Sequence, residues 1–149
     1  MFYLSLQTKP IAMNRFYITT LLLSAVATTF AQGPWKINLK DSKENVELHL
    51  DLYGESIEVP GMEMFGPLNG YLGGDIYRTW AITSFKIKDD KTARIKVSND
   101  LGSETQEIEI KQKNDSVWSV DLLGRNVVKR VKGKKLVKAP SSFQMQKMR

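Results

Sequence analysis

Apolar and polar side chains alternate along the stretch KTARIKVSNDLGSETQEIEIKQKNDSVWSVDLL, residues 91–123. Successive side chains of a strand point to opposite faces, so this period of two indicates half-buried strands. Asn, Asp and Gly interrupt the alternation at 99–102 and at 113–115, where they favour tight turns. The stretch predicts three strands joined by hairpins, near 91–98, 104–112 and 116–123.

The same pattern continues on both sides of this stretch. It predicts further strands near 35–40, 46–53, 55–59, 77–88, 126–132 and 135–138. The strand at 77–88 is apolar on both faces, which indicates a central strand, a bulge that switches faces, or an outer face covered by a loop. The basic tail 141–149 is expected to form a short helix or to stay disordered.

A meander of this length must bury one face and protect its edges, and closing into a barrel does both. We therefore predict an all-β domain over residues 32–140, a single antiparallel meander that closes into a barrel of about eight strands. A two-sheet β-sandwich is the alternative.

The first 31 residues have the parts of a secretory signal peptide. Met13-Asn14-Arg15, an alternative start, precedes the twelve-residue apolar stretch 16–27, and small residues allow cleavage after Ala27 or Ala31. The apolar stretch is too short for a transmembrane helix, which needs about 20 residues. We expect an exported protein, periplasmic or extracellular, without a transmembrane segment.

Positive charge is concentrated at the C-terminal end. Residues 125–149 hold nine basic residues and no acidic one, whereas residues 32–124 carry a net charge of −5. Such asymmetry favours an acidic glycan, a membrane surface or a protein partner, and export argues against nucleic acid. The alternative is a solvated hairpin whose lysines protect a strand edge. The residues expected to contact a polyanion or partner are Lys129, Arg130, Lys132, Lys134, Lys135 and Lys138.

The segment 57–75, IEVPGMEMFGPLNGYLGGD, combines turn-forming glycines and prolines with large apolar side chains. A loop this apolar is expected either to plug the barrel as core or to form the wall of a binding site. In the second case a small apolar or amphipathic ligand binds at the barrel mouth. Its expected contacts are Met62, Met64, Phe65, Leu68, Tyr71, Tyr77 and Trp80.

We expect no enzyme activity, no catalytic residue, no metal and no cofactor. Glu47, His49 and Asp51 share one strand face, which permits an acid–base or metal site, but a solvated face is the simpler interpretation. With one histidine and no cysteine, the chain lacks the usual ligands of structural zinc. The indole of Trp118 falls on the buried face of its strand and is expected in the core.

Gly33-Pro34-Trp35 opens the first predicted strand with a G-x-W pattern. With the meander that follows, the chain resembles the lipocalin-like (calycin) small secreted β-barrels. The resemblance implies that Trp35 packs across one end of the barrel, with Arg130 or Arg125 lying over it. It also implies a non-catalytic binding protein for a small apolar ligand, with docking through the basic C-terminal hairpin as the alternative.

Overall fold

Ten strands and one short 3-10 helix make up the computed structural model, which describes residues 33–149; the predicted signal peptide lies outside the described residues. The elements are β1 (Lys36–Asp41), β2 (Val46–Asp51), η1 (Glu63–Phe65), β3 (Gly70–Gly74), β4 (Trp80–Ile87), β5 (Thr92–Asn99), β6 (Thr105–Gln112), β7 (Val117–Leu123), β8 (Lys129–Lys132), β9 (Lys135–Lys138) and β10 (Ser142–Lys147). Within residues 33–149, no helix is long and apolar enough to cross a membrane.

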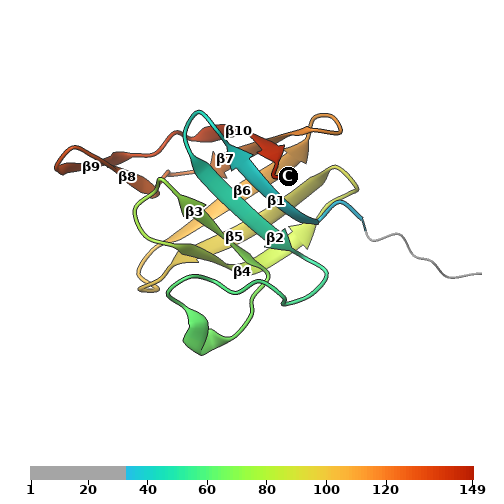
Figure 1. Ribbon diagram of the computed structural model, residues 1–149, viewed down its shortest axis with the longest axis horizontal. Helices are drawn as coiled ribbons and strands as arrows, with labels where there is room; N and C mark the ends of the chain where they lie inside the picture. The colour runs from blue at the N-terminus through green and yellow to red at the C-terminus, as the bar shows by residue number, and fades with distance from the viewer. Residues whose placement is uncertain (1–32) are drawn as a thin grey trace, which may run out of the picture. The chain divides into compact units, whose positions relative to one another are not determined.

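Eight of the strands form a closed antiparallel barrel, which confirms the predicted all-β meander (Figure 1). Strands β1 to β7 follow one another around it, and β10 closes it by pairing with β7 on one side and β1 on the other. Strands β8 and β9 pair only with each other and form a ribbon that projects from the barrel in Figure 1.

Apolar side chains from all eight strands fill the interior. Alternate residues of each strand point inward, as the period of two predicts. The buried set includes Trp35, Leu39, Val46, Leu48, Leu50, Leu72, Trp80, Ile82, Ile95, Val97, Ile108, Ile110, Trp118, Val120, Phe143 and Met145. The prediction that Trp118 belongs to the core is therefore confirmed.

The C-terminal segment differs from its prediction. We expected a short helix or disorder after residue 141, but Ser142–Lys147 is β10, the strand that closes the barrel. Its side chains alternate, with Phe143 and Met145 fully buried and Gln144 exposed. Pairing with β7 and β1 decides its conformation, because a single short strand has little stability alone.

Three other predicted strands also differ from their prediction. The predicted strand at 55–59 is reduced to one isolated bridge between Ile57 and Leu68. The predicted strands near 126–132 and 135–138 exist as β8 and β9, but they form the ribbon and take no place in the barrel.

Strand β3 lies inside the glycine-rich segment that the sequence assigns to a loop. Its glycines allow the close approach to β2: a Cβ on Gly70 would lie 1.9 Å from the carbonyl oxygen of His49, and Gly70 has a φ of +144°. At the other end of β3, a Cβ on Gly74 would lie 2.4 Å from the Asn45 oxygen. Gly70 and Gly74 resemble loop glycines in the sequence, but the close pairing of β3 with β2 requires them.

A register shift between Ile82 and Ser84 interrupts β4. It confirms the bulge that was one of the three explanations for the apolar residues on both faces of the predicted strand 77–88. Trp80 and Ile82 point inward before the shift. After it, Phe85 pairs with the buried Ile95 and so shares its face of the sheet, but 40% of its surface is exposed at this end of β4. A single extra residue thus accounts for the apolar residues on both apparent faces.

The barrel has two ends, named here for the residues at them. The Trp35 end holds the start of β1, and the Glu44 end holds the β1–β2 turn. The expected arginine over Trp35 is not found: Arg130 bonds Glu44 and Asp75 at the opposite end, and Arg125 is exposed just after β7, which also ends there.

Substituting Gly70 by alanine is expected to destabilise the barrel, because a Cβ there collides with the backbone of β2. Gly124 also has a positive φ, but a Cβ on it meets nothing within 4 Å. Gly124→Ala should therefore cost about 1 kcal/mol of unfolding free energy, and Gly70→Ala at least about 2 kcal/mol more. Urea denaturation measures both; equal losses would contradict the close approach of β3 to β2.

Glu109 on β6 contacts three cations on the outer face. Its carboxylate lies 2.9 Å from Arg94 and 3.0 Å from Lys88 and Lys111. These contacts, the Arg94 hydrogen bond first, lower the pKa of Glu109 from 4.5 to about 2. A carboxyl with a lowered folded-state pKa stabilises the fold above its unfolded pKa, and this contribution is lost as the pH falls through the folded pKa.

Glu109→Gln is therefore expected to lower the unfolding free energy near neutral pH by about 1–2 kcal/mol, allowing for the solvent exposure of the three cations. The difference from the unsubstituted protein should shrink between pH 4.5 and about 2, where Glu109 becomes protonated. Glu107→Gln, at an exposed position of the same strand, is the control. Thermal denaturation across this pH range tests the prediction. A loss of unfolding free energy in Glu109→Gln that is independent of pH would contradict it.

Candidate functional site

The barrel closes through two short ladders. Strands β3 and β4 pair only at Tyr71–Ala81 and Leu72–Trp80, and β1 pairs with β10 only at Leu39–Lys147 and Lys40–Gln146. Where paired strands separate, space is left on the outside of the barrel. One hollow lies at each of these seams, an apolar groove at β3–β4 and a polar hollow at β1–β10.

The apolar groove at the β3–β4 seam has a volume of about 450 Å³. Its floor includes Ala81 and Ser98, which pair across β4 and β5 on the outer face. One wall comes from the loop between β2 and β3, and the other from the β5–β6 turn. The full lining is Glu55, Met62, Phe65, Leu68, Asn69, Ala81, Ile82, Thr83, Ser98, Asn99, Asp100, Leu101 and Gly102.

The loop wall is held at its base by Asp51, a carboxylate that is almost fully buried. It accepts hydrogen bonds from the Ser56 hydroxyl and from the backbone N–H groups of Tyr53 and Gly54. These bonds, the Ser56 bond first, lower the pKa of Asp51 although burial opposes the shift. The loop therefore leaves β2 in a fixed direction.

Backbone bonds hold the rest of the loop. Ile57 and Leu68 exchange two backbone hydrogen bonds, at 3.0 and 2.8 Å, so the two arms of the loop run side by side before the chain enters β3. Beyond this pair the chain turns through η1, where the N–H of Phe65 bonds the carbonyl of Met62 at 3.0 Å. An ordered loop presents its apolar side chains at fixed positions, which a binding wall requires.

The opposite wall is fixed by Asn99. Its side-chain oxygen accepts from the Ser103 N–H at 2.9 Å, and its side-chain nitrogen donates to the Ser103 hydroxyl at 2.9 Å. This turn holds Leu101 at the rim with 65% of its surface exposed, facing a groove that Phe65, 63% exposed, also lines. Two large apolar side chains are thus held in water on either side of one groove.

The structure brings together three of the seven predicted ligand contacts. Met62, Phe65 and Leu68 line the groove. Met64 lies on η1 with 86% of its surface exposed and outside the lining. Trp80 is buried in the core, Tyr71 stacks on His49, and Tyr77 lies beside Arg78 at the Glu44 end. The sequence did not indicate the contribution of Leu101, because it falls in an ordinary hairpin turn.

The loop does not plug the barrel, since strand residues fill the interior. Of the loop's apolar residues between 57 and 68, only Val59 is buried, and it is absent from the core cluster. The loop instead lines one side of an outer groove at a seam of the sheet, and its role in ligand binding stays a prediction.

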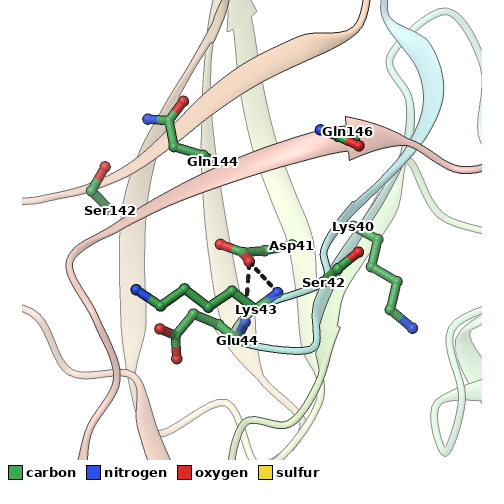
Figure 2. Close-up of a pocket in the computed structure, with 8 residues that line it drawn as sticks. All are labelled: Lys40, Asp41, Ser42, Lys43, Glu44, Ser142, Gln144 and Gln146. Carbon is green, nitrogen blue, oxygen red and sulfur yellow. Dashed lines mark hydrogen bonds between the residues drawn. The ribbon is translucent and has the colours of Figure 1, made fainter.

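Figure 2 shows the polar hollow at the β1–β10 seam. Its Asp41 carboxylate accepts from the backbone N–H groups of Lys43 and Glu44, at 2.9 and 3.1 Å, and so serves the β1–β2 turn. Lys40 points away and pairs with Glu47 at 3.0 Å. Asp41 and Lys40 thus hold the turn and the strand face, and the hollow offers little apolar surface, so we favour the apolar groove as the site.

The polar face around His49 has partners of its own. The His49 ring lies 2.9 Å from the Asn38 side-chain oxygen and 3.3 Å from Glu47, and it stacks on Tyr71 at 4.6 Å between ring centroids. Lys40, first, and His49 lower the pKa of Glu47. Asp51 serves the loop instead, and among residues 33–149 no cluster of His, Asp and Glu suits a metal ion.

The predicted partner residues all lie on the ribbon. Five of the six are exposed lysines, and none of these has an acidic partner within the described part of the chain; they are Lys129, Lys132, Lys134, Lys135 and Lys138. The sixth, Arg130, is half-buried and bonds Glu44 and Asp75.

Comparison of the chain with protein-family models, with curated proteins and with solved structures finds no match.

Asp51→Ala is expected to loosen the loop wall, because it removes the acceptor that fixes residues 53–56. Chymotrypsin should then cleave after Phe65 about tenfold faster, equivalent to losing ~1.4 kcal/mol of local stability. Asp41→Ala removes a similar turn acceptor at the other end and is the control. Equal cleavage in both variants would contradict this role of Asp51.

Proposed function

We propose that the mature protein is an exported, non-catalytic binding protein of lipocalin-like architecture that holds a small apolar or amphipathic ligand in the β3–β4 groove. The observation that carries this proposal is the pair of exposed apolar side chains, Phe65 and Leu101, fixed on opposite walls of one groove. Exposed apolar surface of this kind is unfavourable in water, and a ligand that covers it gains the free energy of its burial.

The size of the groove supports a small molecule. Its volume of about 450 Å³ lies within the range of about 300–1,000 Å³ that small-molecule sites occupy. The proposal differs from the expected mouth site in its location: the core fills the interior, so the ligand lies against the outer face of β4 and β5.

Polar groups at the groove favour one kind of ligand head. Glu55 and Asp100 belong to the lining, and Asp100 is already paired with Arg78 at 3.2 Å. A carboxylate or phosphate on the ligand would be repelled by Glu55, which has no basic partner among residues 33–149, and Arg78 offsets the charge of Asp100. The favoured ligand therefore has an apolar body with a neutral or cationic head.

Binding of the neutral dye Nile red tests the proposal. Phe65→Ser combined with Leu101→Ser should weaken binding at least tenfold, since it removes the apolar walls, each worth about 1.5–3 kcal/mol when fully covered. Val131→Ser combined with Leu136→Ser changes two exposed apolar residues on the ribbon and should leave dye binding unchanged. Equal weakening in both double variants would contradict the site.

Competition tests the preference for the head group. Decylamine, a cation at neutral pH, should displace the dye at a lower concentration than decanoate, because the lining carries the carboxylate of Glu55. If decanoate displaces the dye better, the assignment of the head group is wrong even where the groove itself binds.

A further inference from the structure

The ribbon β8–β9 places like charges directly opposite each other. Its four cross-strand pairs are Lys129–Lys138, Arg130–Val137, Val131–Leu136 and Lys132–Lys135. Opposed side chains on antiparallel strands lie about 4.5–5.5 Å apart at Cβ, and like charges at that distance destabilise the pairing. Two of the four pairs therefore oppose formation of the ribbon.

The ribbon is nevertheless held firmly at its base. The Arg130 guanidinium bonds the carboxylate and the carbonyl of Glu44 and lies 2.9 Å from Asp75. The Lys129 carbonyl accepts from the N–H of Tyr77 at 2.6 Å. The barrel thus supports a ribbon whose own charges repel one another, a local conflict that is typical of functional sites.

Alternation gives the ribbon two different faces. Arg130 and Val137, both half-buried, share the face that reaches the barrel. Lys129, Lys138, Val131 and Leu136 share the other face, where Val131 and Leu136 are 54% and 47% exposed. This outer face joins an aliphatic pair to a lysine pair. Lys132 and Lys135 pair on the Arg130 face at the tip of the ribbon, where Lys134 also lies.

We propose that the ribbon docks on a lipid bilayer that contains anionic headgroups. The lysines would meet the phosphates, and Val131 and Leu136 would enter the boundary between headgroups and acyl chains. An acidic glycan would satisfy the lysines but would leave the aliphatic pair in water. Of these two partners, only the bilayer covers both.

Co-sedimentation with vesicles of mixed phosphatidylcholine and phosphatidylglycerol tests the proposal. The compact unit Gln32–Arg149 contains every described strand and the whole described core, so it serves as the protein. It should bind the mixed vesicles at low salt and dissociate from them at high salt, and it should not bind vesicles of pure phosphatidylcholine. Replacing Lys129, Lys132, Lys135 and Lys138 by glutamine should weaken binding several hundredfold, at about fivefold per lysine.

A matched variant distinguishes the effect of the ribbon lysines from the effect of the protein's net charge. Replacing Lys86, Lys91, Lys96 and Lys113 by glutamine removes the same charge from exposed positions on the barrel and should reduce binding far less. Val131→Ser with Leu136→Ser should weaken vesicle binding about tenfold, through lost apolar burial. The ribbon lysine variant should melt no lower than the unsubstituted protein, because its repulsive pairs are gone.

Three outcomes would overturn the proposal. These are equal loss of vesicle binding in the two lysine variants, no binding of the unsubstituted protein to anionic vesicles, and binding to heparin without binding to the vesicles. The last would assign the ribbon to a soluble polyanion. Each is independent of the dye experiments on the groove, so either proposal can fail alone.

Discussion

The barrel depends on β10 lying between β7 and β1. Without it, both neighbours would present a row of unpaired backbone groups, and the side chains of Phe143 and Met145 would be missing from the core. Strand β7 ends at the Glu44 end and β10 begins there, so the two form a hairpin whose connection contains the β8–β9 ribbon. The ribbon is therefore an insertion in the hairpin that closes the barrel.

Closure through short ladders accounts for the positions of the polar hollow and the apolar groove. A long ladder keeps two strands together and leaves no space between them, whereas two paired positions allow them to separate beyond the seam. At β1–β10 the space is lined by polar groups that hold a turn. At β3–β4 an ordered loop adds apolar side chains, which makes this seam the better candidate for binding.

Much of the fold could be predicted from the sequence, because alternation is a local signal that a half-buried strand must carry. The run 91–123 gave three strands close to their observed bounds. Strand β3 could not be found this way, since Gly70 and Gly74 are required by the proximity of β2, a contact between segments far apart in the chain. Strand β10 carries alternation, but over too few residues to outweigh a tail-like composition.

The candidate site was less predictable than the fold for the same reason. The apolar loop 57–75 was recognised by composition, and Met62, Phe65 and Leu68 do share a groove. Leu101 reaches this groove only through the pairing of β4 with β5, which composition does not reveal. Trp80 was assigned to the site from its position near the loop, but the inward phase of β4 places it in the core.

Amide hydrogen exchange along β10 shows whether this strand closes the barrel. We predict that the β10 amides bonded to β7 exchange as slowly as those in the middle of β6, because opening β10 opens the barrel. Exchange of these amides at the rate of an unstructured peptide, while β6 stays protected, would contradict closure by β10.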